Sequence, residues 1–531
     1  MNNIPTYSEA KLKLTREEKI GQFFMPAAFI NDTEEEIKKL EDLIRSEGVG
    51  GLCFFHSRAS AATNFEGKKE VIYNENSLDT LKRLIDRYQK IAKYPLLISI
   101  DAEWGLAMRI ENTPQYPYAM TLGAIKNGAE LLYEVGKNIA HDCKNSGIHW
   151  NLSPVADINN NPNNPVIGYR SFGEDKIEVA QKATAFVKGT QSEGILTSVK
   201  HFPGHGDTAT DSHLGLPVID KSQKDLMENE LYPFEQLVKS GVDSVMVGHL
   251  AVPSLTNGEA IPATLSDTII KGILRTDFGF KGVVISDALN MHSVSKMYPV
   301  KGELEWVAFN AGNDVLCFTE HIKEGIQTIS KNASEDQIET SFERVWRLKK
   351  KALDNAPQTY KDSLNPLDLN LRLARQSLTL VKGSEQDIAN FRASTFDGVT
   401  VGKVEKNCFL ETLTNALGGN QSVYSDKIES QIEDCKNIVL AIFPPEVKPT
   451  GNFGFTDREV AFINHLMATK NVVVYLFGNA YFLDRISIEK AKSVVVAYQN
   501  FEVFQQNAAQ HFTGKFTANG QLPISLNSYV K

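Results

Sequence analysis

Residues 195–216 read ILTSVKHFPGHGDTATDSHLGL and join an apolar run to a loop of unusual composition. The run Ile195–Val199 predicts a short buried strand, because it is continuous, apolar and followed by turn-forming residues. The proline and two glycines within 203–206 exclude a helix directly after it. Lys200 and His201 are therefore expected at the carboxyl end of a strand.

Asp211 and His213 follow on the predicted loop. A carboxylate two residues from a histidine can bond one ring nitrogen, fix the tautomer and raise the basicity of the other nitrogen. Because imidazole titrates near neutral pH, this pair predicts a proton-transfer dyad. Two alternatives stay open. One is a hydrogen-bonded loop without chemistry, and the other is a metal site drawing on His201, His205, Asp207, Asp211 and His213.

Outward from this stretch, short apolar runs alternate with longer charged, amphipathic stretches such as 34–46, 77–92, 128–145, 176–192 and 221–239. Eight strands separated by helices predict a parallel sheet closed as a (β/α)8 TIM-type barrel, and an open doubly wound sheet is the alternative. The strand candidates are 23–29, 49–55, 96–100, 148–155, 195–199, 242–247, 282–285 and 315–318.

Polar residues stand at the ends of successive strand candidates. In such barrels the active site lies at the carboxyl ends of the strands. A parallel sheet has no structural need for charges at only one end, so the pattern favours function over strand termination. The residues are Asp101, Asp157, Lys200, His201, His249 and Asp287.

The second half of the chain predicts a smaller α/β sandwich domain, with strand candidates at 378–381, 438–443, 472–477 and 494–498. The segment Ala352–Pro366 is polar and contains two prolines, which favours a boundary there. We predict a catalytic barrel at 1–351, a linker at 352–369 and a C-terminal domain at 370–531.

Composition limits the functional classes. The net charge of −9, without a cluster of Lys or Arg, argues against a nucleic-acid surface. No apolar run approaches the roughly 18 residues of a membrane span. The five cysteines are scattered and odd in number, which favours reduced thiols and the cytoplasm. The N-terminal residues do not resemble a signal peptide, although a removed leader would leave the same sequence. The sequence does not indicate an oligomeric state.

Asp287 follows GVVIS and precedes ALNMH, so the predicted strand delivers a carboxylate to the mouth of the barrel. A helix N-cap is the alternative role. Attack on an anomeric carbon needs a carboxylate on one face of the sugar and a proton donor on the other. Beside a His/Asp loop, Asp287 is therefore favoured as a nucleophile, with His213 and Asp211 in the place of the proton donor.

Several motifs resemble glycoside hydrolase family 3, and within it the β-N-acetylglucosaminidases. They occur in family order over roughly residues 18–350. The motifs are KHFPGHGDTATDSH (200–213), NLSPVADINNNPNNPVIGYRSFG (151–173), MVGHL (246–250), PATLS (262–266) and LRTDFGFKGVVISDALNM (274–291).

This resemblance implies retaining cleavage of a terminal β-linked N-acetylglucosamine, with Asp287 as nucleophile and His213 with Asp211 as acid/base. It implies no metal and no cofactor. The chain departs from the family at DAEWG (101–105), where the family commonly has DQEGG; Trp104 then either stacks on a sugar face or fills a core position. The implied sugar-binding residues are Asp101, Arg109, Arg170, Lys200 and His201.

The leading hypothesis is thus an exo-acting β-N-acetylhexosaminidase (EC 3.2.1.52) that uses a covalent glycosyl-Asp intermediate. By resemblance, it would act on peptidoglycan-derived muropeptides in cell-wall recycling. The alternatives are a β-N-acetylglucosaminide phosphorylase, a broader β-glucosidase, a metal-dependent hydrolase and a non-catalytic glycan-binding protein.

Overall fold

The computed structural model describes residues 4–58, 72–208, 215–354, 364–404, 406–425, 428 and 432–527. The chain divides into two compact units. The first contains most of the chain up to residue 364. The second contains residues 365–531 together with two earlier segments, 117–131 and 159–179. The predicted domain limits at 351/352 and 369/370 stay a prediction.

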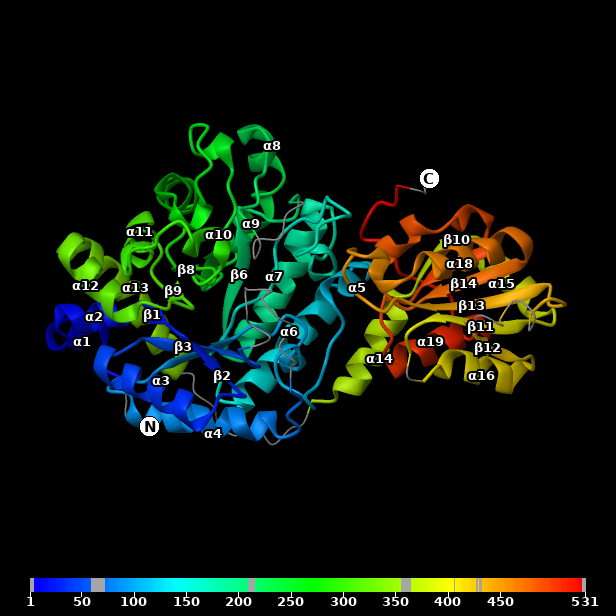
Figure 1. Cartoon of the computed structure of the whole chain (residues 1–531), viewed down its shortest axis with the longest axis horizontal. Coiled ribbons are helices and arrows are strands. Elements are labelled where there is room, and N and C mark those ends of the chain that lie inside the picture. The colour runs from blue at the N-terminus through cyan, green and yellow to red at the C-terminus, as the bar shows by residue number, and fades with distance from the viewer. Residues whose placement is uncertain are drawn as a thin grey trace. The chain divides into compact units, whose positions relative to one another are not determined.

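The first unit is built around short strands that alternate with helices (Figure 1). Its strands are β1 (Phe24–Met25), β2 (Ala27–Phe29), β3 (Gly51–Phe55), β4 (Leu97–Ile100), β5 (Trp150–Asn151), β6 (Leu196–Phe202), β7 (Ser244–Val247), β8 (Val283–Ser286) and β9 (Leu316–Cys317).

These strands close into a ring. β2 to β8 form one parallel sheet in sequence order, and β1 pairs in parallel with β9. A parallel bridge joins Ile285 of β8 to Val315, which directly precedes β9. Pro26 splits the first strand into β1 and β2, and the two pieces pair with opposite neighbours. Counting them as one strand gives the eight that the apolar runs predict, so the predicted (β/α)8 fold is confirmed.

Helices follow the strands, and local sequence sets their ends. In α3, Thr33 caps the first turn in a capping box with Glu36, and Gly48 ends the helix in the left-handed conformation. Its apolar residues recur at helical spacing and are buried. The helices that begin before residue 364 are α1 (Tyr7–Lys13), α2 (Arg16–Gly21), α3 (Glu34–Glu47), α4 (Ser77–Ile91), α5 (Ala119–Gly123), α6 (Ala129–Asn145), α7 (Lys176–Ser192), α8 (Gln223–Glu228), α9 (Tyr232–Lys239), η5 (Thr268–Asp277), α10 (His292–Ser295), α11 (Glu303–Ala311), α12 (Ile322–Asn332) and α13 (Glu335–Asp354).

Two predicted elements differ from the structure at prolines. The stretch 221–239 forms two helices, because α9 begins anew with Pro233 in its first turn, where a missing N–H costs nothing. The run 148–155 forms only the short strand β5. Beyond it, the carbonyl groups of Ser153 and Pro154 still accept hydrogen bonds from backbone N–H groups of β6. Pro154 has no N–H, so it cannot donate a hydrogen bond to a neighbouring strand.

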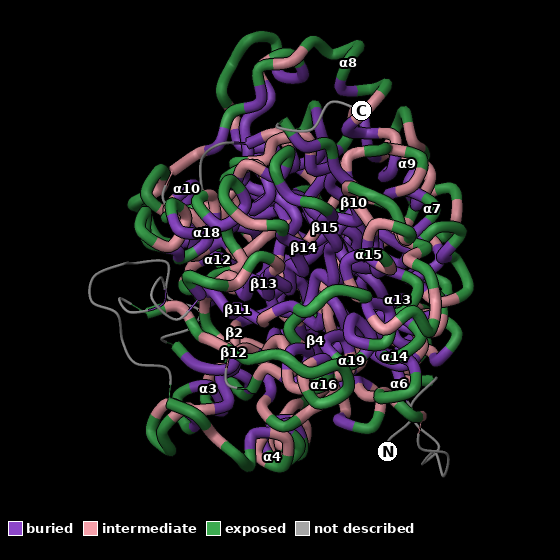
Figure 2. The backbone as a smooth tube through the Cα atoms, turned by 90° about the vertical axis from the view of Figure 1, so that its right-hand side faces the viewer, coloured by how far each residue is buried: buried purple, intermediate pink, exposed green. Residues whose placement is uncertain are grey.

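The second unit contains a six-stranded sheet in the order β10-β15-β14-β13-β11-β12. Only the edge strand β10 runs antiparallel to its neighbour. Figure 2 shows β13, β14 and β15 as buried, and apolar clusters pack on both faces of the sheet. The elements are α14 (Pro366–Ser377), β10 (Thr379–Lys382), α15 (Glu385–Arg392), β11 (Asp397–Gly402), α16 (Cys408–Leu417), β12 (Gln421–Val423), β13 (Asn437–Phe443), α18 (Asp457–Thr469), β14 (Asn471–Leu476), β15 (Ser493–Val496) and α19 (Glu502–Phe512).

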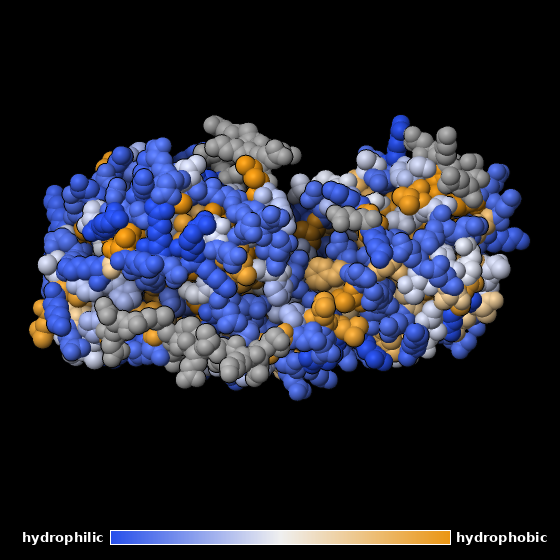
Figure 3. All heavy atoms as spheres, turned by 90° about the horizontal axis from the view of Figure 1, so that it is seen from below, coloured by the Kyte–Doolittle hydropathy of each residue, from blue (hydrophilic) through white to orange (hydrophobic). Residues whose placement is uncertain are grey.

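The surface, the helices and the cysteines bear on the limits set by composition. On the face drawn in Figure 3, hydrophilic side chains cover most of the surface. None of the described helices is both long and apolar enough to cross a bilayer. All five cysteines are free thiols, and four of them are buried.

A buried lysine on α13 gives a stability prediction. Lys349 is fully buried and donates a hydrogen bond to the Gln22 side chain, while burial lowers the pKa of Lys349 to about 7. The unfolded chain binds this proton more tightly than the folded chain does. Burial of the Lys349 ammonium therefore lowers the free energy of unfolding by its full amount below pH 7, and this effect disappears as the pH rises toward about 10.4.

Lys349→Met is therefore expected to raise the free energy of unfolding by about 1–3 kcal/mol at pH 6, after the loss of the bond to Gln22 is subtracted. Urea unfolding at pH 6 and pH 9.5 would measure it, and the gain should shrink at the higher pH. Lys350→Met, at the neighbouring and partly exposed position, is the control. An equal gain at both pH values would contradict this account.

Candidate active site

The polar residues expected at strand ends occupy one edge of the barrel. β4 ends at Ile100 directly before Asp101, β8 ends directly before Asp287, and β6 itself contains Lys200 and His201. Because β4 to β8 are consecutive parallel neighbours, their carboxyl ends adjoin. The mouth of the barrel therefore collects carboxylates, imidazoles and an ammonium group.

The first polar group at the mouth centres on Asp101. Lys200 Nζ lies 2.7 Å from Asp101 Oδ1 and 2.9 Å from Glu103 Oε1, and Arg109 Nη2 lies 2.9 Å from Asp101 Oδ2. Burial alone would raise the pKa of Asp101, but the charges of Lys200 and Arg109 outweigh it and lower that pKa to about 2. Asp101 is thus ionised at neutral pH. A carboxylate has about four acceptor sites, so it can still accept bonds from ligand hydroxyl groups.

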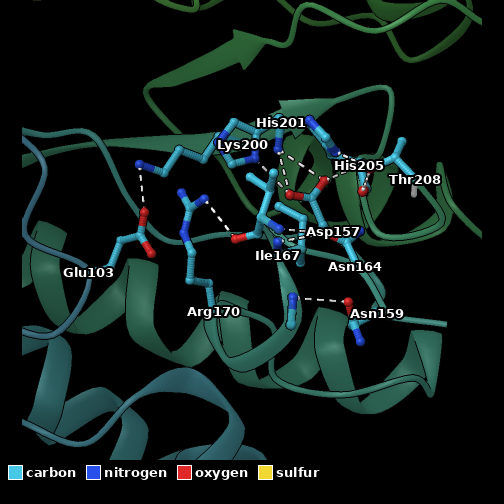
Figure 4. A network of polar contacts seen from close by, with 12 residues as sticks. Glu103, Asp157, Asn159, Asn164, Ile167, Arg170, Lys200, His201, His205 and Thr208 are labelled. Atoms are coloured by element: carbon cyan, nitrogen blue, oxygen red, sulfur yellow. Dashed lines mark hydrogen bonds and ion pairs between the residues drawn. The ribbon is translucent and has the colours of Figure 1, made fainter. Parts of the chain in front are cut away.

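Asp157 organises the start of the histidine loop (Figure 4). Its carboxylate accepts bonds from His201 Nδ1 at 2.7 Å, from the His201 backbone N–H at 3.1 Å and from the His205 backbone N–H at 2.8 Å. Burial raises the pKa of Asp157, but the interactions with His201 and His205 lower it by more, so the pKa lies below its ordinary value. The imidazole of His201 is therefore held with Nδ1–H toward Asp157.

Asp287 lies beside a second histidine at the mouth. His249 places Nε2 2.9 Å from the Ala288 carbonyl and Nδ1 2.8 Å from Thr264 Oγ1. A carbonyl only accepts, so Nε2 carries a proton. The Thr264 hydroxyl also lies 2.8 Å from the Gly248 carbonyl and 3.1 Å from the Val247 carbonyl. These contacts hold the His249 ring in place beside Asp287.

His249 and its neighbours act on the ionisation of Asp287. Burial raises the pKa of Asp287, but His249, His201, the Ala288 backbone N–H and Lys200 together lower it below the ordinary value. Asp287 Oδ1 accepts the Ala288 N–H at 2.8 Å. Asp287 is therefore a carboxylate at neutral pH, which is the protonation state that a nucleophile requires.

The histidine loop is described on both sides of its centre. Lys221 Nζ lies 2.6 Å from Asp207 and 2.6 Å from Glu230, so an ion-pair bridge ties the first part of the loop to the segment that follows it. Asp211 and His213 lie outside the described residues. Their predicted acid/base role stays a prediction.

Two further predicted positions have separate surroundings. Arg170 belongs to the second compact unit, where its guanidinium donates to the Val166 carbonyl at 3.2 Å, and its role in sugar binding stays a prediction. Trp104 is partly exposed, which favours stacking on a ligand over filling the core. Next to it, Ala102 is fully buried, and its backbone N–H and carbonyl are both bonded by the Asn151 side chain.

Sequence reasoning placed Asp157 and His249 at the barrel mouth without a specific role, and it assigned no role to Glu103. Asp157 and His249 were recognisable as polar residues at strand ends, and Glu103 as part of the DAEWG stretch. What the sequence does not show is pairing across strands, such as the bond between Asp157 and His201, which are 44 positions apart.

Within the part of the chain that the structure describes, no group of three His, Cys, Asp or Glu side chains is arranged to hold a metal ion. His201, His205 and Asp207 fall within this part. His205 has its Nδ1 2.7 Å from Thr208, and burial, with the charge of His201, lowers the pKa of His205 to about 4. His205 is therefore neutral and anchored within its own loop.

Comparison with known proteins agrees with this geometry. A β-hexosaminidase A from Pseudoalteromonas piscicida is 32% identical over 342 residues, which cover 59% of this chain and 55% of that protein. A β-hexosaminidase from Neisseria meningitidis serogroup C is 34% identical over 291 residues, covering 54% of this chain and 74% of that protein. The chain thus spans little more than half the length of the first relative.

Solved structures resemble the chain over nearly all of its length. A glycoside hydrolase family 3 β-N-acetylglucosaminidase from Paenibacillus sp. str. FPU-7 superposes with a TM-score of 0.77 at 28% identity, covering 97% of this chain and 100% of that one. A β-glucoside phosphorylase, BglX, gives 0.80 at 20% identity, covering 99% and 96%, which is a likeness of fold. The model for the glycosyl hydrolase family 3 N-terminal domain matches residues 15–348. This chain therefore belongs to glycosyl hydrolase family 3.

Proposed function

We propose that the chain is a retaining, exo-acting β-N-acetylhexosaminidase that releases terminal β-linked N-acetylglucosamine. The observation that carries this proposal is an ionised Asp287 at the same barrel mouth as the Asp101, Lys200 and Arg109 group. This arrangement supplies a nucleophile and a set of hydroxyl-binding groups. The identity to β-hexosaminidases supports the choice of sugar.

In the first step, an Asp287 oxygen attacks the anomeric carbon and forms a glycosyl ester, while the bond from that carbon to the leaving oxygen breaks. His213 gives its proton to the leaving oxygen, and Asp211 stabilises the imidazolium before the transfer. The cations around Asp287 keep it ionised before attack. Asp287 can still attack, because the electron pair that forms the ester bond is matched by the pair that departs with the leaving oxygen, where the proton of His213 neutralises it.

In the second step, His213 removes a proton from water, and the resulting hydroxide attacks the anomeric carbon. The ester bond breaks, and Asp287 leaves as a carboxylate. Two displacements at one carbon retain its β configuration. The charges of His249 and Lys200 stabilise the departing carboxylate.

The sugar is oriented by groups that are already in place. Asp101 is held between Lys200 and Arg109, so it cannot rotate without breaking two charge-assisted bonds. We propose that its remaining acceptor sites bind two sugar hydroxyls, while Lys200, Arg109 and His201 donate to others.

The direct experiment uses a 4-nitrophenyl N-acetyl-β-glucosaminide with and without inorganic phosphate. The proposal expects release of nitrophenol and free N-acetylglucosamine at a rate that phosphate leaves unchanged. Strict dependence on phosphate, with the sugar 1-phosphate as product, would instead identify a phosphorylase. A strong preference for the matching glucoside would identify a β-glucosidase.

The role of His213 makes a separate prediction. His213→Ala is expected to lower kcat by about 10²–10⁴-fold on glycosides with poor leaving groups and much less on activated aryl glycosides, because the latter need no proton to depart. A series of aryl glycosides of graded leaving-group pKa would measure this. His465→Ala, at an exposed histidine on α18 outside the proposed machinery, is the control. Equal losses across the series would remove His213 from the acid role.

The natural substrate is proposed to be a peptidoglycan-derived muropeptide, and the place of action the cytoplasm. Both proposals rest on resemblance and on the reduced cysteines. A comparison of kcat/KM for anhydromuropeptides and for chitobiose would test the substrate, and cell fractionation would test the location.

A further inference from the structure

A cavity lies on the same side of the barrel as Asp287. Its volume is about 210 Å³, and its walls come from the segment after β8, from α10 and α11, and from the segment after β9. Leu289, two positions after Asp287, lines it, and the Leu289 backbone N–H donates to the Cys317 carbonyl at the end of β9. The cavity therefore continues the line of strand-end groups beyond Asp287.

Glu305 of α11 lines this cavity and is 2% exposed. Its Oε2 is buried and has no hydrogen-bond partner among the described residues. Burial raises the pKa of Glu305, and Glu324 adds to this, while the backbone N–H groups of Glu305 and His321 and the His321 side chain oppose it. A buried carboxyl oxygen without a partner is costly, and a donor on a bound ligand would satisfy it.

The other walls combine apolar surface with hydrogen-bonding groups. Leu289, Leu304 and Val300 contribute apolar contacts, and Tyr298 contributes both a ring and a hydroxyl. The side chains that can donate are those of His292, Lys296, Tyr298 and His321.

This composition selects among ligand classes. The acids Glu305 and Glu320 are balanced by Lys296 and the imidazoles, so neither a strongly anionic nor a strongly cationic ligand is favoured. A sugar ring has hydroxyls that both donate and accept, together with apolar C–H faces that pack on rings such as that of Tyr298. The volume is below the roughly 300–1,000 Å³ of sites for larger ligands, which indicates a single ring.

We propose that this cavity is a second saccharide site, which takes one neutral sugar ring through Glu305 and Tyr298, next to the segment that follows the strand of the nucleophile. The proposal rests on the glycosidase function above. Two sources share this chemistry, namely the leaving-group sugar of the substrate and a separately bound sugar.

Glu305→Gln and Tyr298→Ala test the site, and Glu303→Gln on the same helix, outside the lining, is the matched control. If the cavity holds the leaving-group sugar, both test variants raise KM for N,N′-diacetylchitobiose by roughly tenfold. They leave kinetics on N-acetyl-β-glucosaminyl fluoride unchanged, because its leaving group has no ring to occupy the cavity. Thermal unfolding shows that each variant is folded, and Tyr298→Ala still tests the site if Glu305→Gln is not.

If the cavity holds a separate sugar, calorimetric titration of the wild-type chain with N-acetylglucosamine shows a second binding event that both test variants lose. Unchanged chitobiose KM together with no loss of a binding event would overturn the proposal. A wild-type chain inactive on the aryl substrate would instead refute the glycosidase function, and the titration would still decide whether the cavity binds sugar.

Discussion

Asp287→Ala is expected to lower kcat by at least about 10⁴-fold on every glycoside, because no other carboxylate is proposed to form the ester bond. Initial rates on an aryl N-acetyl-β-glucosaminide would measure the loss. Added azide should restore part of the activity, since a small anion fits the space of the missing carboxylate and attacks the anomeric carbon directly. The product should then be the α-glycosyl azide, with inverted configuration.

The wild-type protein offers a second view of the same step. After exposure to an activated 2-fluoro glycoside, intact-protein mass spectrometry should show one added sugar, and digestion should place it on Asp287. Asp277→Ala, at an exposed aspartate at the end of η5, is the control and should keep wild-type rates. Labelling of another residue, or activity of Asp287→Ala without azide, would contradict the assignment.

Asp101→Asn is expected to lower kcat/KM by about 10²–10³-fold. The amide keeps the shape but loses the charge that holds Lys200 and Arg109, and one of its two ends donates rather than accepts. Lys200 keeps Glu103 as a partner, while Arg109 loses its carboxylate partner. Both the binding of sugar hydroxyls and the orientation of the cations should therefore suffer.

The measurement is a comparison of kcat and KM on the aryl substrate, with Asp86→Asn on the exposed side of α4 as the control. Because the pKa of Asp101 is held near 2, the acid limb of the pH–rate profile above pH 4 should belong to other groups. A variant with near-normal kcat/KM would show that the charge of Asp101 is needed neither for sugar binding nor for holding Lys200 and Arg109 in place.

Much of the barrel could be predicted because burial leaves a local signal. Each strand is a short apolar run, and α7 occupies the range 176–192 that its amphipathic pattern indicates. Prolines limited the accuracy, since Pro26 divides the first strand and Pro233 restarts a helix. The grouping of 117–131 and 159–179 with the second unit depends on contacts with distant residues, which no local pattern reveals.

The sequence indicated which residues lie at the candidate site, but not which of them contact one another. Strand-end polarity identified Asp101, Lys200 and Asp287. It did not show that Lys200 joins Asp101 to Glu103, because those residues are about a hundred positions away in the chain. Apolar periodicity specifies which face of an element is buried, while hydrogen-bond partners depend on the three-dimensional register of neighbouring strands.

The closure of the barrel has a consequence for synthesis. The ring is completed only when β9 pairs with β1, and helix α13 then reaches back to the start of the chain through Trp346, which donates to the Pro5 carbonyl. A nascent chain on the ribosome therefore keeps two unpaired strand edges until roughly residue 350 has emerged, and needs protection from aggregation for that time.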